Sequence, residues 1–201
     1  MSGAFPTTPK IQSLSFRNVR PVVMDHALSG KRVVRQIGGQ YFSLSVSMPP
    51  MKVDDANSIF AFLQKQKGSF ETFTIQHPID NRGAGKSETD ILVNGSHNAA
   101  DSTIALDGFA ASTTGVLKAG DLIKFANHTK VYMVQDDVDS NSSGEVTVSI
   151  EPGTVAALAD NEAVTVNKPS FTVYLEQQDI LYQLNNRGLY NIQFEVREVV
   201  T

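Results

Sequence analysis

The residues most suggestive of catalytic or binding chemistry lie between positions 80 and 87. The run G-A-G-K-S at residues 83–87 ends like a phosphate-binding loop, whose full pattern is G-x-x-x-x-G-K-[ST] between a strand and a helix. The first glycine of that pattern falls on Asp80, whose carboxylate would repel phosphate, and no helical periodicity follows. We therefore interpret residues 80–87 as a Gly-rich polar linker.

A second group of polar residues has part of the spacing of a calcium loop. Asp137, Asp139 and Asn141 stand at the first three ligand positions. The glycine that turns such a loop is replaced by Ser142, and Val148 stands where the bidentate acid belongs. An ordinary hairpin loop is the favoured interpretation, with a weak surface cation site as the alternative.

The remaining candidates for catalysis are scattered. The four histidines, His26, His77, His97 and His128, form no metal-binding pair, and each is interpreted as a loop or interface residue. No G-x-S-x-G nucleophile motif occurs, and the chain has no cysteine. The sequence therefore predicts no catalytic residue, no cofactor and no metal site.

Composition favours a soluble β protein made in a reducing compartment. Of the 201 residues, 41% are hydrophobic and 19% are charged. The absence of cysteine excludes disulfides, and no stretch is long enough to span a bilayer, so we expect no membrane association. Residues 81–169 contain 12 acidic and 6 basic residues, a net charge of −6, whereas the remainder carries +2. Nothing in this balance indicates a general nucleic-acid surface.

Period-two patterns predict strands near both ends of the chain. Residues 41–48 and 190–197 both alternate between apolar and polar side chains. Residues 22–24 and 33–34 flank a turn near Gly30, which predicts a hairpin. Shorter strands are predicted at residues 70–76 and 171–175, and Asn186-Arg187-Gly188 is predicted to form the turn before the last strand.

One amphipathic helix is predicted after Pro49-Pro50. Asp54 or Asp55 is expected to cap it, and the helix ends near residues 65–68. Its apolar positions, at 3.6-residue spacing, are Ala56, Ile59, Phe60 and Leu63. Six short strands separated by turn residues follow, at residues 91–93, 103–106, 122–125, 131–134, 146–150 and 163–166.

These elements predict a mainly β protein, with a β-sandwich or barrel flanked by one helix and an inserted small β-barrel. The C-terminal strands need partners, and the long N-terminal strands can supply them. We therefore expect residues 1–80 and 170–201 to form one discontinuous domain. Residues 81–169 would be a second domain inserted into it.

The insertion resembles a small β module that recurs in bacteriophage tail proteins. Three pieces carry the resemblance: a "G-D-x-I" strand within L-K-A-G-D-L-I-K-F at residues 117–125, a "K-V-Y-x-V" strand at residues 130–134, and a "G-x-x-T-V-x-I-x-P" strand at residues 144–152. The spacing between the pieces also fits.

The resemblance implies a tail-tube-like fold, which tube, distal tail and baseplate hub proteins share, with the helix over residues 54–67 flanking the sheet. Distal tail proteins of long-tailed phages are the most similar in plan. The implied function is that of a structural virion component, not an enzyme, which forms a ring, expected to be a homohexamer, between the tail tube and the tail tip or baseplate.

The same resemblance implies the partners and the location. Copies of the chain would contact one another, the tail tube, tip or baseplate proteins, and tail fibres. DNA would pass through the lumen without specific binding. The expected location is the virion tail, assembled in the host cytoplasm.

The predicted hairpin at residues 22–37 is the candidate subunit interface, because a projecting hairpin can extend the sheet of a neighbour by edge pairing. We expect Met24, Leu28, Val33 and Val34 to be buried against the neighbouring subunit. The alternative is that the hairpin packs on its own domain.

Three other functions compete with this hypothesis. A major tail tube protein has the same class of fold. A carbohydrate-binding tail module needs exposed aromatic side chains, for which the insertion offers Phe109, Phe125 and Tyr132, and the chain has no tryptophan. An enzyme needs a convergent set of titratable groups, which the sequence does not supply.

Overall fold

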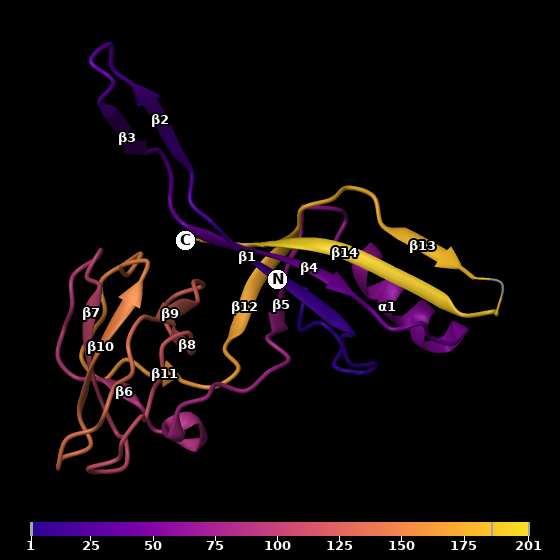
Figure 1. Ribbon diagram of the computed structural model, residues 1–201. Helices are drawn as coiled ribbons and strands as arrows, with labels where there is room; N and C mark the ends of the chain where they lie inside the picture. Colours follow the sequence, from indigo (N-terminus) through magenta and orange to yellow (C-terminus); the bar gives the residue numbers. More distant parts are fainter. Residues whose placement is uncertain (1, 186, 201) are drawn as a thin grey trace. The chain divides into compact units, whose positions relative to one another are not determined.

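The computed structural model describes residues 2–185 and 187–200 and confirms a mainly β protein. The chain separates into two compact units. The first runs to Phe73 and resumes at Val173, and the second spans Thr74–Thr172. Figure 1 shows the strands of both units and the helix α1 of the first. Within the described residues, no helix has the length and apolar character needed to cross a membrane.

The first unit is built on one sheet that joins the two ends of the chain. Its strands, in spatial order, are β1 (Ser13–Val19), β4 (Tyr41–Ser47), β14 (Tyr190–Glu198), β12 (Ser170–Leu175) and β5 (Thr72–Gln76), and β13 (Leu181–Leu184) also pairs with β14. β14 runs antiparallel to β4 and places Phe194 opposite Val46. The predicted pairing of C-terminal with N-terminal strands is therefore present.

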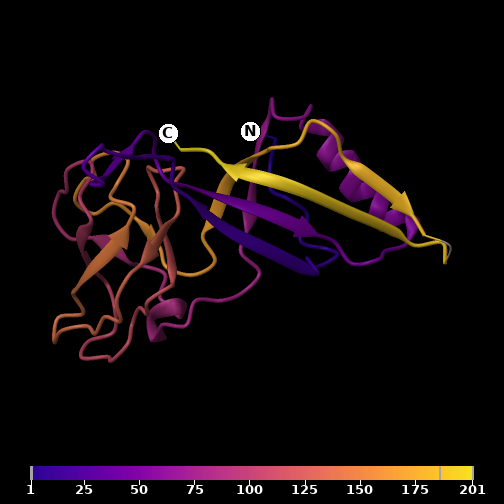
Figure 2. The same ribbon diagram turned by 45° about the horizontal axis from the view of Figure 1, so that its top comes forward.

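Helix α1 (Val53–Lys65) lies along this sheet beside β13 and β14 (Figure 2). Ala56, Ile59 and Leu63 are buried and have the predicted spacing, because residues three and four apart share one helix face. Phe60, predicted for the same face, is only partly buried. The apolar stripe of α1 thus covers the core side of the sheet.

The predicted cap of α1 is wrong. The residue before the helix is Lys52, and its side chain makes no capping hydrogen bond. Asp54 and Asp55 lie inside the first helical turn instead. The positive end of the helix dipole stabilises negative charges there. This interaction explains the acidic residues at the start of α1 as well as a cap would.

The hairpin of the first unit is a separate two-stranded sheet, formed by β2 (Val22–His26) and β3 (Arg32–Gln36). The turn near Gly30 is confirmed: Gly30 has a φ of +78° and donates its N–H to the Ala27 carbonyl at 2.8 Å. Every residue from 22 to 39 is exposed. An isolated two-stranded hairpin is marginally stable in water, so this ribbon has little support within its own unit.

The second unit is a small β-barrel. Its strands, in spatial order, are β11 (Val164–Thr165), β8 (Leu122–Phe125), β9 (Tyr132–Val134), β10 (Val146–Glu151), β7 (Thr103–Asp107) and β6 (Leu92–Val93). A bridge between Leu92 and Ala163, and a 2.9 Å hydrogen bond from Val164 N–H to the Ile91 carbonyl, join the first and last strands. Closure removes free sheet edges from this unit. All six predicted strands are present.

The start of the barrel is held by a buried carboxylate. Asp121 is 2% exposed and accepts backbone hydrogen bonds from Arg82 at 2.7 Å, Gly83 at 2.9 Å and Lys118 at 3.0 Å. A short 3-10 helix, η1 (Ala84–Ser87), follows directly. The interpretation of residues 80–87 as a linker is therefore wrong, because this segment is fixed to the barrel.

The chain enters and leaves the barrel at one place. The Asn81 backbone N–H donates to Asn167 Oδ1 at 3.0 Å, and Asn81 Nδ2 donates to the Val166 carbonyl at 2.6 Å. The Lys168 ammonium lies 2.8 Å from the Asp80 carboxylate and lowers the pKa of Asp80, mainly through this hydrogen bond. These contacts form a clamp, residues 80–81 with 166–168, between the two ends of the barrel.

Strand β13 was not predicted from the sequence. It forms a hairpin with β14, and Tyr182 lies opposite Ile192. Asn185 donates its N–H to the Leu189 carbonyl at 2.9 Å, and Gly188 has a φ of +74°. The predicted turn therefore lies at the expected place, although Asn186 itself is outside the described residues.

His128 belongs to the barrel core rather than to a loop surface or an interface. It is 3% exposed, and its Nδ1 lies 2.7 Å from the Tyr132 hydroxyl. That hydroxyl also accepts a hydrogen bond from the Val155 N–H at 3.0 Å, so Tyr132 links the histidine to the backbone near Val155. Burial lowers the pKa of His128, because it disfavours the charged imidazolium.

Asp121→Ala should destabilise the barrel by about 3 kcal/mol, because one buried and two partly buried backbone N–H groups lose a charged acceptor. Asp121→Asn should cost less, since one amide oxygen remains. Chemical denaturation followed by circular dichroism measures both values. The matched control is Asp136→Ala, which removes an exposed carboxylate of the same unit. Equal stability of the Asp121→Ala and Asp136→Ala variants would contradict the anchoring role.

The barrel should lose stability in mild acid through His128. The pKa of His128 is below 6.5 when folded, so the unfolded chain binds more protons as the pH falls below about 6.5. The free energy of unfolding should therefore decrease between pH 7.5 and 5.5. His128→Gln should show a smaller decrease over the same range. Parallel pH profiles for the two proteins would show that another group is responsible.

Candidate assembly interface

The hairpin β2–β3 carries apolar side chains on both of its faces. Residues directly opposite one another in an antiparallel pair share a face. The first face contains Val22, Met24, His26, Arg32, Val34 and Gln36, and the second contains Val23, Asp25, Val33 and Arg35. No side chain of this ribbon is buried by the rest of its unit. The two faces are therefore equally available to a partner.

The structure places the four predicted interface residues at three different points of the hairpin. Met24 and Val34 are register partners on the first face, 55% and 45% exposed. Val33, 53% exposed, lies on the second face, and Leu28 is fully exposed at the tip. Burial of these residues against a neighbouring subunit stays a prediction.

Sequence reasoning missed three more exposed apolar residues on the same ribbon. Val22 and Val23 are both 51% exposed, and Ile37 is 62% exposed. The signal that could have found them is the length of the hairpin, since all three fall within the predicted residues 22–37. The apolar surface offered by the hairpin is therefore larger than the four predicted residues.

A second exposed apolar surface lies where α1 meets β13, and we call it the α1–β13 patch. Its members are Val53, Phe60, Tyr182, Leu184 and Tyr190. The ring of Tyr182 stacks on Phe60 and on Tyr190, with centroids 4.6 Å apart in both pairs. Val53 is 46% exposed and Leu184 is 59% exposed.

A hydroxyl group anchors the middle ring of this patch. The Tyr182 hydroxyl donates to Asn57 Oδ1 at 2.7 Å. The pKa of Tyr182 is raised, first by desolvation and then by the neighbouring Tyr190. This hydrogen bond and the two stacking contacts connect β13 to α1 and to β14.

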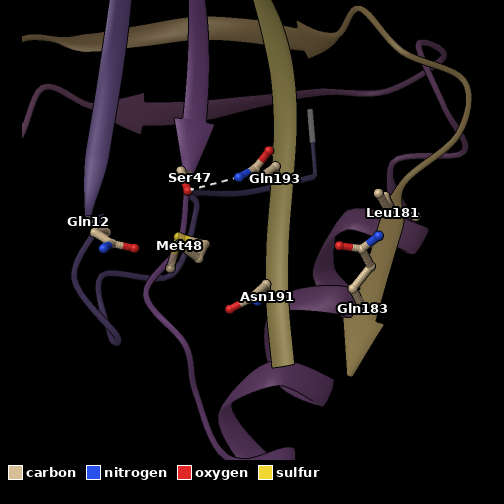
Figure 3. Close-up of a pocket in the computed structure, with 7 residues that line it drawn as sticks. All are labelled: Gln12, Ser47, Met48, Leu181, Gln183, Asn191 and Gln193. Carbon is tan, nitrogen blue, oxygen red and sulfur yellow. Dashed lines mark hydrogen bonds between the residues drawn. The ribbon is translucent and has the colours of Figure 1, made fainter. Parts of the chain in front are cut away.

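We call the sheet of the first unit, β1–β4–β14–β12–β5 with β13, the scaffold sheet. Its side that faces away from the core is polar. In Figure 3, a shallow hollow of about 280 Å³ on this sheet is lined by Gln12, Ser47, Met48, Leu181, Gln183, Asn191 and Gln193. None of these residues is charged. Gln193 Nε2 donates to Ser47 Oγ at 3.4 Å across β14 and β4. The hollow offers carboxamides and a hydroxyl but no group with acid–base capacity.

The phosphate-loop-like run is used inside the barrel. Ala84 N–H donates to the Gly115 carbonyl and Gly85 N–H to the Val116 carbonyl, both at 2.9 Å. A Cβ atom at Gly85 would come within 2.8 Å of the Phe109 ring. The glycine is therefore needed for close packing, and these amides are not directed at a ligand.

The calcium-loop-like residues also serve the barrel itself. Asp137 accepts the Ala119 N–H at 2.9 Å, which is the largest cause of its lowered pKa. Asp139 accepts the Gly115 N–H at 2.6 Å, and Asn141 accepts two loop N–H groups. In the part of the chain that the structure describes, no three acidic or histidine residues are grouped to hold a metal ion.

The barrel lacks the exposed rings that a glycan-binding module would need. Phe109 is 5% exposed, and Phe125 and Tyr132 are fully buried. All three belong to the barrel core. The aromatic residues that the carbohydrate hypothesis requires are therefore used for packing.

Exposed apolar side chains are distributed unequally between the two units. Of the large hydrophobic residues found exposed among the described residues, only Ile79 belongs to the second unit. Exposed apolar surface marks sites of protein association. The fold is mainly β, and its exposed large apolar side chains are concentrated on the first unit, which makes that unit the candidate for an assembly interface.

The comparisons with known proteins agree with an assembly role. Residues 81–171 match the family model described as distal tail protein pb9, B domain. The chain is also 27% identical over 204 residues to distal tail protein pb9 of Escherichia phage T5, which covers 96% of each chain. The predicted resemblance to phage distal tail proteins is confirmed, and it supports a structural component of a phage tail.

Hydrogen exchange should distinguish the hairpin from the rest of its unit. In monomeric protein, amides of residues 22–36 should exchange at least about tenfold faster than those of β4 and β14, because no packing protects the ribbon. In assembled protein the hairpin should become protected. Mass spectrometry of deuterated peptides measures this, with β4 as the internal control. Equal protection of hairpin and β4 in the monomer would show that the hairpin packs on its own unit.

Proposed function

We propose that this chain is a structural, non-enzymatic phage tail component that forms a homohexameric ring between the tail tube and the tail tip or baseplate. The observation that carries the proposal is the hairpin β2–β3, which exposes apolar side chains on both faces and is covered by nothing in its own unit. In a monomer the apolar side chains of this ribbon stay in water and contribute no hydrophobic stabilisation. An assembly gains buried apolar area from it.

The edges of the scaffold sheet support a head-to-tail arrangement of copies. Among the described strands, β1 pairs only with β4, and β13 pairs only with β14. The sheet therefore ends in β1 on one side and in β5 and β13 on the other. Contacts between different surfaces of identical subunits generate rings when the rotation closes.

The polar sheet face suits a lumen through which DNA passes without specific binding. Arg17 lies 3.7 Å from the Glu195 carboxylate, and the Arg197 guanidinium lies 3.7 Å from the centre of the Tyr41 ring. Both cations are thus engaged within the sheet. A surface that binds DNA tightly needs cations available for the phosphates.

We further propose that residues 1–80 and 170–201 form the assembling domain and that residues 81–169 are an inserted peripheral domain. The clamp between residues 80–81 and 166–168 supports the insertion, because it places the two ends of the barrel together. The net charge of −6 and the almost complete lack of exposed large apolar residues support contact with solvent or tail fibres.

Electron microscopy of the purified full chain in negative stain tests the proposal. Closed rings of one subunit layer support the distal adaptor. Long helical tubes would favour a major tail tube protein instead. A monodisperse monomer at high concentration would contradict self-assembly altogether.

Deleting residues 26–33 should abolish the rings, because it removes the turn together with the paired strand residues His26, Arg32 and Val33. The milder pair Met24→Ser and Val34→Ser should weaken each contact about a hundredfold, since burying two such side chains contributes about 3 kcal/mol. Light scattering after gel filtration measures the assembly. Thr103→Ser with Thr147→Ser, on exposed barrel positions, is the matched control. Rings that survive the deletion would remove the hairpin from the interface.

A further inference from the structure

The chain carries two exposed apolar surfaces that differ in shape. One is the hairpin β2–β3, a ribbon with two apolar faces and two strands whose outer edges are unpaired among the described residues. The other is the α1–β13 patch, which combines a helix face with an edge strand. Both belong to the first unit. This asymmetry is what a head-to-tail contact between identical chains requires.

The patch is organised to receive a strand. Val53, Asn57 and Phe60 recur at intervals of four and three residues and so share one face of α1. Tyr182 and Leu184 alternate along β13 and point to the same side of the sheet as that helix face, as the Tyr182 contacts with Phe60 and Asn57 show. The apolar side chains of α1 and β13 therefore lie next to the unpaired edge of β13.

The free edge of β13 lacks the usual protection against pairing. Its sequence is Leu-Tyr-Gln-Leu, with no charge and no proline. Natural edge strands are normally protected by charges, prolines, bulges or a covering segment. An uncharged edge next to stacked half-buried rings fits β-strand addition by a partner.

The charges of the two surfaces are complementary. The hairpin carries Lys31, Arg32 and Arg35 against the single acid Asp25. The first turn of α1, beside Val53, carries two exposed acids, Asp54 and Asp55. Opposite charges at the rim of an apolar contact set its orientation and disfavour wrong partners.

We propose that the occupant of the α1–β13 patch is the hairpin β2–β3 of a second copy of this chain. One strand of the hairpin adds to the free edge of β13, and one apolar face of the ribbon covers the patch. The basic tip region of the hairpin lies toward the acidic start of α1. This inference rests on the proposed ring and names the two surfaces that meet in it.

Cross-linking between introduced cysteines tests this contact without background, because the chain has no cysteine of its own. The variant carries Val34→Cys on the hairpin and Leu184→Cys on the patch, two exposed positions whose replacement leaves the core intact. A short bismaleimide is added to the assembled full-length protein, and products are separated under denaturing conditions. A ladder of covalent multimers is expected, with at least about tenfold more product than in the controls.

Three controls test whether the cross-linked products are specific to the contact between hairpin and patch. Each single cysteine variant should give almost no product, since a head-to-tail contact does not bring a position next to itself. The pair Val34→Cys with Ser143→Cys, on an exposed barrel turn, should also give almost none. Circular dichroism checks that every variant keeps the parent fold.

The possible outcomes separate this inference from the proposed function. Rings that form but give no ladder would overturn the hairpin-to-patch contact and leave the ring intact. Dimers from Leu184→Cys alone would show a two-fold contact at the patch and would also overturn it. A parent protein that never assembles would overturn both proposals.

Discussion

The pairing of β4 with β14 is the contact on which the rest of the structure depends. It joins residues 41–47 to residues 190–198 and so closes the scaffold sheet across almost the whole chain. Phe194 opposite Val46 and Val196 opposite Leu44 place one continuous apolar face under α1. Without this pairing, the core face of the sheet would be divided between two unconnected segments. The α1–β13 patch is positioned by it, because β13 pairs with β14 and α1 contacts the same strand.

The pairing of β4 with β14 is compatible with the barrel between them in sequence, because the chain leaves the barrel next to the residues where it entered. Asn81 bonds to Asn167 and Val166, so the two ends of the barrel meet in one clamp. Asp121 then fixes the first residues inside the barrel. The barrel strands β6–β11 form a sheet of their own, and Ile79 is the one large hydrophobic residue found exposed in the second unit among the described residues.

Local patterns in the sequence predicted most elements of the fold. The six barrel strands, the hairpin turning at Gly30 and the helix with Ala56, Ile59 and Leu63 all follow from spacing and turn residues. Strand β13 escaped because four residues that mix apolar and polar types give almost no periodicity. The anchoring roles of Asn81 and Asp121 escaped because their partners are distant in sequence: Asn167 lies 86 residues from Asn81, and Arg82 lies 39 residues from Asp121. Of the candidate interface, the sequence predicted the ribbon but not the α1–β13 patch, which depends on the unpredicted strand.

The central claim is that residues 1–80 and 170–201 assemble, whereas residues 81–169 are peripheral. Native mass spectrometry of a chain in which a short Gly-Ser linker replaces residues 81–169 tests it most directly. The account predicts that this shortened chain folds and forms oligomers with the same number of subunits as the full chain. A folded monomer, or a chain that no longer folds, would contradict it.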